Sequence, residues 1–162
     1  MEIVIVESIV GCFIVLIACV VGISNGAEGL VCLYEKEVQR RVVELGLISE
    51  RKIKRNELLF KLFGIIPFFI FVMVSVYGIN SARGFWEAFR QICFIIMTEG
   101  LFDRLFIDWY WVGKTKTWVI PGTEDLMPYI YGKTLVIKWI FTLIGYPIIA
   151  AAISGIMMQF IK

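Results

Sequence analysis

The segment IVIVESIVGCFIVLIACVVGI, residues 3–23, determines the class of fold. Only Glu7, Ser8 and Gly11 interrupt its apolar character, and a run of about 20 apolar residues matches the hydrocarbon thickness of a bilayer. A secretory signal peptide is disfavoured, because Glu2 stands where such a leader has basic residues and the apolar run exceeds the usual length. The segment therefore predicts a first membrane-spanning helix.

The composition of the whole chain supports this prediction. The 162 residues are 59% hydrophobic and 19% charged, whereas soluble domains are about half apolar and about a quarter charged. A soluble single domain is therefore excluded. Each span needs about 20 residues plus a connection, so the length admits about four or five spans and excludes a large two-repeat transporter in one chain. The sequence predicts an all-α integral membrane protein, with residues 1–162 forming a single transmembrane domain.

Three further apolar segments complete a predicted set of four transmembrane helices. The second span covers residues 58–79, with Asn56 as its N-cap and Pro67 producing a kink. The third covers 89–112 and is anomalous, because it contains several charged residues. The fourth covers 135–161.

Two long connections, residues 24–57 and 113–134, join these spans. From Ala27 to Leu47 apolar residues recur every three or four positions, which predicts an amphipathic helical extension that continues the first helix. Its apolar stripe needs a partner, either the lipid interface or a second copy of the chain. In the second connection, a short helical turn is expected after Thr123, and Pro128 should end it.

The distribution of Lys and Arg predicts the orientation. Ten of them lie in the two long connections, against two, Arg83 and Lys162, on the other side. The ten are Lys36, Arg40, Arg41, Arg51, Lys52, Lys54, Arg55, Lys114, Lys116 and Lys133. The positive-inside rule then places both connections in the cytoplasm and both termini outside, as in a multi-pass protein of a bacterial inner membrane. The group Arg51, Lys52, Lys54 and Arg55 serves as this topology signal or as a basic patch that faces anionic lipid.

The charged residues of the third span are the main candidates for function. In an α-helix Glu99 and Asp103 share a face, whereas Arg104 and Asp108 lie on a roughly opposite one. Charges near the bilayer centre are costly, so these four side chains must meet protein, water or one another. We expect Arg104 and Asp108 to form a structural ion pair and Glu99 and Asp103 to bind a proton or cation.

Alternatives remain open for these charges. Arg90, Arg104 or Lys138 could neutralise the two carboxylates, and Lys138 could contact Asp108 from the fourth span. At either side of the membrane, Glu7 and Lys138 lie close enough to a span end to reach the interface by snorkelling.

Small residues at four-residue intervals predict close helix packing. They are Ala18, Gly22 and Gly26 near the first span and Ala151 and Gly155 in the fourth. This spacing lets two helices approach closely, either within one chain or between copies.

The sequence lacks the residues that several common kinds of functional site require. The chain has no histidine, and its four cysteines show no CxxC spacing, so zinc, haem and Ser-His-Asp sites are disfavoured and no cofactor is expected. A net charge of +2 is too small to suggest nucleic acid. A divalent metal held by Asp103, Asp108 and Glu124 stays open.

The functional hypothesis is an oligomeric channel or transporter subunit. It would bind a proton, a small cation or an amphiphile at the carboxylates of the third span, Glu99 and Asp103. A non-transporting accessory or scaffold protein is the first alternative, and a membrane-embedded enzyme acting on lipid is the second. The expected partners are the lipid bilayer and either further copies of the chain or a membrane complex.

Overall fold

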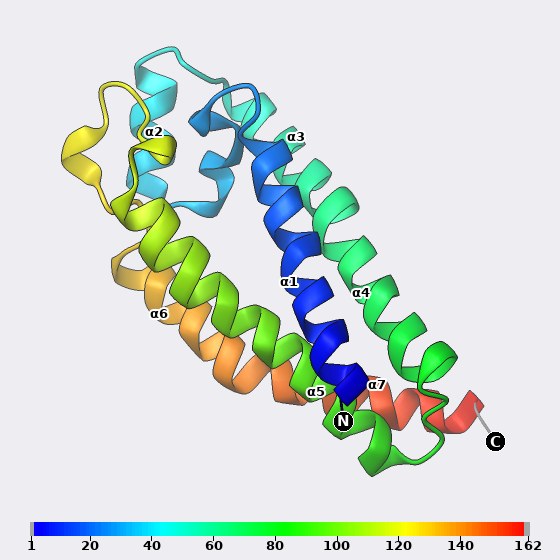
Figure 1. The fold of residues 1–162 in the computed structure, drawn as a ribbon. Coiled ribbons are helices and arrows are strands. Elements are labelled where there is room, and N and C mark those ends of the chain that lie inside the picture. The colour runs from blue at the N-terminus through cyan, green and yellow to red at the C-terminus, as the bar shows by residue number, and fades with distance from the viewer. Residues whose placement is uncertain (1, 161–162) are drawn as a thin grey trace.

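The computed structural model describes residues 2–160, and within this range the chain forms only helices, turns and connecting loops (Figure 1). Four long helices make a bundle, three of them built from an α-helical and a π-helical part. Their bounds are α1 Glu2–Gly22; α3 Glu50–Phe60, π-helical Lys61–Ile65, α4 Ile66–Met73 and π-helical Val74–Ile79; α5 Phe85–Phe102 and π-helical Asp103–Val112; and α6 Gly132–Ile140, π-helical Phe141–Gly145 and α7 Tyr146–Phe160. The all-α fold class is confirmed.

Three of these helices are long and apolar enough to cross a membrane: Glu2–Gly22, Glu50–Ile79 and Gly132–Phe160. They correspond to the predicted spans 3–23, 58–79 and 135–161, of which residue 161 lies outside the described range. The predicted third span, 89–112, also falls within one helix. That helix differs from the other three because of its charged residues.

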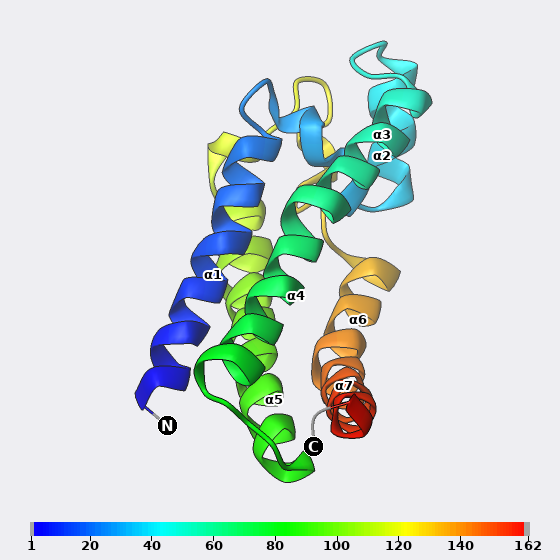
Figure 2. The same ribbon diagram turned by 90° about the vertical axis from the view of Figure 1, so that its right-hand side faces the viewer.

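The charged helix α5 lies at the centre of the bundle. It packs most extensively against α1 and α7 and also meets α4 (Figure 2). Its residues Ile92, Ile95 and Ile96 are buried with Phe68 and Val72 of α4 in one apolar core. Charged side chains can therefore sit on this helix and be covered by its neighbours.

The second helix begins earlier than the sequence predicts. Ser49 is its N-cap, with the side-chain Oγ accepting a hydrogen bond from the Lys52 amide at 3.3 Å. The predicted cap Asn56 lies inside the helix and instead donates to the Gly29 carbonyl at 2.9 Å. The basic residues therefore project from the first two turns of α3, where all four are exposed; they are Arg51, Lys52, Lys54 and Arg55.

Two of the π-helical segments end two residues before a proline. The amide of Ile66 donates to the Lys61 carbonyl ahead of Pro67, and the amide of Tyr146 donates to the Phe141 carbonyl ahead of Pro147. A proline ring cannot donate and collides with the carbonyl four residues earlier. One wider turn relieves both problems, so each helix continues through its proline.

The predicted amphipathic segment after the first helix is helical, but the prediction that it continues that helix is wrong. Helix α1 ends at Gly22, a turn follows in which Gly26 has φ 127°, and the chain folds back through a 3₁₀-helical segment, Ala27–Leu33, and α2, Lys36–Glu44. Most of the apolar stripe is covered within the chain itself, although Leu45 stays 46% exposed. The covered part packs into one core with the second connection; the members are Leu30, Tyr34, Val38, Val42, Trp118, Ile120 and Tyr129.

The two connections thus build a layer, residues 23–49 and 113–131, at one end of the bundle, here called the loop-end layer (Figure 1). The expected turn after Thr123 is present as a 3₁₀-helical segment, Glu124–Leu126. Thr123 is its N-cap residue, but the side chain makes no capping hydrogen bond; its hydroxyl donates to the Ile120 carbonyl at 2.9 Å and meets the Tyr129 hydroxyl at 2.8 Å. The other end of the bundle carries the turn 80–84, and α1 begins and α7 ends toward that same end (Figures 1 and 2).

The small residues fall in different surroundings. Ala18 faces Gly64, whose added Cβ would lie 3.1 Å from that of Ala18. Gly22 packs on the side chain of Leu30, and Gly26 is part of the turn beyond α1. In the fourth helix Ala151 is half-buried. A Cβ on Gly155 would meet no atom of residues 2–160 within 4 Å.

Candidate functional site

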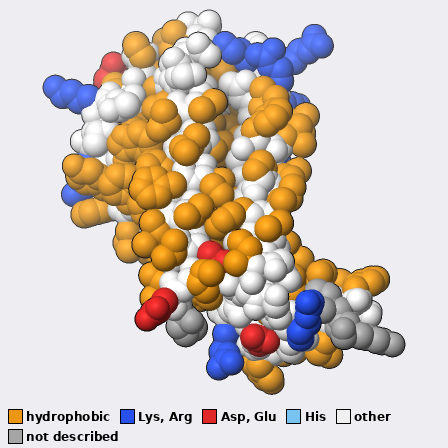
Figure 3. Space-filling view, turned by 45° about the vertical axis from the view of Figure 1, so that its right-hand side comes forward, with side chains coloured by type: hydrophobic (Ala, Val, Ile, Leu, Met, Phe, Trp, Pro, Cys, Tyr) orange, Lys and Arg blue, Asp and Glu red, His pale blue; other side chains and the backbone are white. Residues whose placement is uncertain are grey.

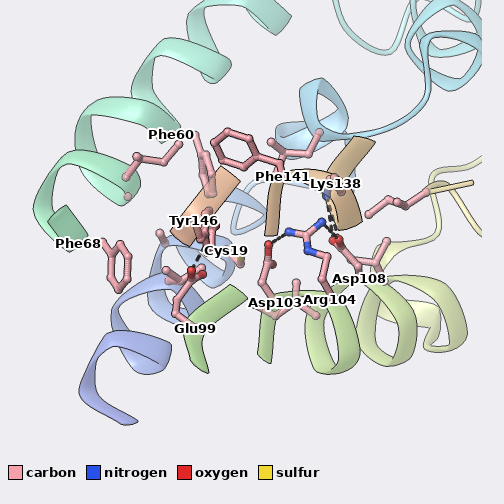
Figure 4. A pocket seen from close by; sticks show the side chains of 18 of the residues that line it. Cys19, Phe60, Phe68, Glu99, Asp103, Arg104, Asp108, Lys138, Phe141 and Tyr146 are labelled. Atoms are coloured by element: carbon pink, nitrogen blue, oxygen red, sulfur yellow. Dashed lines mark hydrogen bonds and ion pairs between the residues drawn. The ribbon is translucent and has the colours of Figure 1, made fainter. Parts of the chain in front are cut away.

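A cavity of about 330 Å³ lies where the four helices and the loop-end layer meet (Figure 4). Most of its wall is apolar or aromatic. Among the residues of the bundle helices, six charged or tyrosine side chains also line it, four from the charged helix and two from the last helix: Glu99, Asp103, Arg104, Asp108, Lys138 and Tyr146. All four charged candidates of the predicted third span therefore reach one cavity.

The π-helical segment Asp103–Val112 explains why these charged side chains reach the same cavity. On an α-helical period, Glu99 and Asp103 would lie roughly opposite Arg104 and Asp108. That prediction is wrong: a π-helix closes its turns over five residues, which brings Asp103 and Asp108 to the same side.

Arg104 is the centre of an ion cluster. Its Nη1 contacts Asp108 Oδ2, and its Nη2 contacts Asp103 Oδ2. Lys138 Nζ of α6 donates to both Asp108 oxygens, at 3.0 and 3.1 Å. The structure thus brings together the expected pair, Arg104 and Asp108, and adds a cation and a carboxylate to it. Two carboxylates face two cations, so the ion cluster of Asp103, Arg104, Asp108 and Lys138 is formally neutral.

The four residues of the ion cluster differ in their burial. Arg104 and Asp108 are 7% and 6% exposed, whereas the side chains of Asp103 and Lys138 retain 20% and 21%. Lys138 therefore reaches toward the bundle interior, although its outer part stays accessible. Arg90, the other proposed neutralising cation, lies near the end of the bundle that carries the turn 80–84. It donates to the Trp86 carbonyl and is not part of the ion cluster.

Glu99 stands apart from the ion cluster (Figure 4). It is 4% exposed, and its one hydrogen bond among the described residues comes from the Tyr146 hydroxyl, 3.5 Å from Oε2. No ion pair within residues 2–160 includes Glu99. Because Asp103 bonds to Arg104, the two carboxylates expected to act as a pair have different partners.

Sequence reasoning missed Tyr146 and Tyr34. The apolar-then-acidic loop Trp118–Asp125 could be expected either to re-enter the membrane surface or to cover the mouth of a polar crevice, and Trp118 does line the cavity. Tyr34 and Trp118 line the cavity and pack edge to face with ring centroids 6.5 Å apart, while Tyr34 and Tyr129 are 5.0 Å apart. All three are at most 3% exposed. The aromatic residues of the second connection were visible in the sequence, but nothing local indicated which helix they cover.

A second group of polar residues, buried or half-buried, lies near the end of the bundle that carries the turn 80–84. Asn80 donates to Glu7 Oε2 at 2.8 Å and to Gln91 Oε1 at 2.9 Å. Glu7 is 5% exposed, so its carboxylate is buried against Asn80 and does not extend into the surroundings of the bundle. This group ties α1 to the turn after the second helix.

The expected metal alternative is not assembled. Glu124 accepts from the Gly122 amide at 2.9 Å in an exposed loop and does not line the cavity with Asp103 and Asp108. Within residues 2–160 no group of three or more His, Cys, Asp or Glu side chains could hold a metal ion.

Glu35 fixes the start of α6, the helix that supplies Lys138. Its Oε1 accepts the Thr134 amide at 2.8 Å, and this hydrogen bond lowers the pKa of the Glu35 carboxyl. Nearby, the Tyr131 hydroxyl donates to Glu37 at 2.9 Å. These contacts tie α6 to the loop-end layer, whereas no residue of α6 itself is buried.

No protein-family model, curated protein or solved structure matches this chain. Its class therefore rests on its own fold and site. The chain is a helical bundle with three helices apolar enough to cross a membrane and with a cavity that combines aromatic walls, a neutral ion cluster and one separate carboxylate.

Proposed function

We propose that the chain is a multi-pass membrane protein with four spans that binds a cationic species at Glu99 as a step in transport. Large apolar side chains cover the flank of the bundle, and Lys and Arg gather toward its ends (Figure 3). The three apolar helices surround α5 and shield its charges, which supports α5 and its π-helical extension as the fourth span.

The positive-inside rule orients this protein. The loop-end layer and the start of α3 hold the excess of Lys and Arg, so they belong on the cytoplasmic side and both chain ends outside. The basic residues on α3, Arg51, Lys52, Lys54 and Arg55, are exposed where they would meet anionic headgroups.

The observation that carries the proposal is the separate position of Glu99. The neighbouring ion cluster is already balanced, so Glu99 adds one formal negative charge to the cavity. A buried carboxylate without an ionic partner costs several kcal/mol, and a bound proton or cation removes that cost. Asp103, which is shared with Arg104, serves in holding the cluster.

This geometry favours a site inside each chain over a pore between copies. Residues from all four long helices of one chain line the cavity, so a second copy is not needed to complete it. Assembly into a homo-oligomer would then join complete sites.

A scaffold role is the second candidate, and one specific observation supports it. Each of the four charges in the ion cluster has an ionic partner, as expected when charges only specify how helices assemble. On this view Glu99 would be a passive neighbour.

A hydrophobic carbodiimide separates the two roles, because it partitions into lipid and modifies protonated carboxyl groups. In proteoliposomes we expect an adduct at Glu99, located by mass spectrometry, that decreases as pH rises. Glu99→Gln should abolish the adduct and reduce proton flux measured with an internal pH dye.

The matched control is Glu50→Gln, at an exposed acid on α3. It should leave adduct and flux unchanged. A Glu99→Gln protein with the wild-type helical content and undiminished flux would refute the proposed role of Glu99, as would a folded wild type whose Glu99 resists the reagent.

A further inference from the structure

The cavity that contains Glu99 is larger than its charges require. A water molecule occupies about 30 Å³ of liquid, so a proton or an inorganic ion would leave most of the 330 Å³ unfilled. Pockets for small organic molecules begin at about 300 Å³. The size of the cavity therefore matches an organic ligand.

The walls near Glu99 are aromatic. Figure 4 shows Phe60, Phe68 and Tyr146 on the side of Glu99, with the ion cluster on the other side. Aromatic faces attract cations, most strongly where water is excluded. A carboxylate among aromatic rings accommodates one positive charge on an apolar body.

The cavity is closed toward the loop end. Tyr34, Trp118 and Ile130 line it there and are 3%, 1% and 6% exposed. A hydrated ion that approaches from that side meets a packed aromatic layer.

The cavity opens on the flank of the bundle. Ile65 of the second helix and Phe141 of the last helix both line it, yet they are 41% and 52% exposed. These two helices pack on α1 and α5 more closely than on each other. Their side of the cavity faces the region that lipid chains would occupy.

We propose, building on the cation site at Glu99, that the ligand is a monovalent organic cation with a bulky apolar body, which enters from the bilayer between Ile65 and Phe141. Its charge pairs with Glu99, and its body fills the space between Phe60, Phe68 and Tyr146. The single charge follows from the neutral ion cluster, which leaves one carboxylate to balance.

Two probes of the same shape and opposite charge test this proposal. In nanodiscs of neutral lipid, tetraphenylphosphonium should bind saturably, one per chain, and tetraphenylborate should only partition into the lipid. Glu99→Gln should weaken the phosphonium by about tenfold or more, as expected for one charge-assisted contact. Equal binding of both ions, or binding unaffected by Glu99→Gln, would overturn the proposal.

Neighbouring residues test the route. Ile65→Trp should slow phosphonium binding several-fold, whereas Ile66→Trp should not, because Ile66 is similarly exposed at 46% but does not line the cavity. Equal rates for the two variants would overturn entry between Ile65 and Phe141.

The carbodiimide experiment keeps the two proposals distinguishable. If Glu99 reacts and conducts protons but phosphonium does not bind saturably, the organic ligand is wrong and the cation site stands. If Glu99 neither reacts nor supports flux, both proposals fail.

Discussion

Asp108 accepts hydrogen bonds from two cations at once, Arg104 and Lys138, with its side chain 5% exposed. A single swap of Asp108 with Lys138 would therefore not restore the contact, because Arg104 would then face a lysine. The stability of this region depends on the group of charges more than on any one pair.

We predict that Asp108→Asn lowers the free energy of unfolding by about 3–5 kcal/mol, the usual effect of removing one partner from a buried ion pair. Lys138→Met should cost only about 1 kcal/mol, because the Arg104–Asp108 pair survives and Lys138 is partly exposed. Equilibrium unfolding in micelles of increasing sodium dodecyl sulfate, followed by tryptophan fluorescence, measures both. Equal losses would show that Lys138 contributes as much as Asp108.

At this scale the sequence predicts contacts within one helix and not contacts between helices. Arg104 and Asp108 are four residues apart, so their pairing could be expected from spacing alone. Glu99 and Tyr146 are 47 residues apart, and their contact depends on how α5 meets the last helix. There an added Cβ on Gly100 would lie 2.5 Å from Tyr146 Cε2, so the close approach depends on a glycine that no sequence spacing singled out.

The elements were predicted best where hydropathy alone determines them. Both π-helical turns before prolines and the one at Asp103–Val112 escaped prediction, because sequence patterns assume the α-helical period. The amphipathic segment after α1 showed which side chains would be buried. It could not show that their partner is a connection about 80 residues later, since apolar faces are not specific for one partner.

The attachment of α6 to the loop-end layer should depend on pH through Glu35. The Thr134 amide favours the ionised carboxylate and lowers its folded-state pKa from the ordinary value of 4.5. A lowered pKa stabilises the folded contact above the unfolded-state value, and this contribution is lost as pH falls through the folded-state pKa. We predict that hydrogen-exchange protection of the Thr134 amide, corrected for intrinsic rates, is present at about pH 6 and falls progressively as the pH drops below the ordinary carboxyl pKa of 4.5.

Glu35→Gln should remove the part of this dependence that arises from Glu35, because the glutamine oxygen still accepts but does not titrate. Glu44→Gln, at an exposed acid of α2, is the matched control and should retain the wild-type profile. Lys133, Glu37 and Tyr131 lie nearby and are unchanged in both variants. A Glu35→Gln profile identical to wild type would mean that another group controls the start of α6.

The whole molecule combines a sealed end with an accessible flank. The loop-end layer packs its own aromatic core, whereas the bundle below it exposes large apolar residues such as Phe63, which is 74% exposed. That contrast is unfavourable in water and favourable in lipid, because lipid provides the apolar surroundings that the flank lacks.

Labelling with a membrane-impermeant maleimide in intact cells tests insertion and orientation together. We predict that Arg83→Cys, in the exposed turn between the second helix and α5, reacts from outside. Glu50→Cys, at the start of α3, should react only after the membrane is permeabilised, because the proposed orientation, which follows from the Lys and Arg excess, would place this end in the cytoplasm. Phe63→Cys should stay unlabelled in both conditions although Phe63 is one of the most exposed side chains, since lipid would cover it. The chain without these substitutions measures the background labelling of the native cysteines, of which Cys12 and Cys19 are buried and Cys32 and Cys93 are half-buried. Rapid reaction at Phe63→Cys would exclude membrane insertion of the second helix, and reaction of Glu50→Cys in intact cells would reverse the orientation.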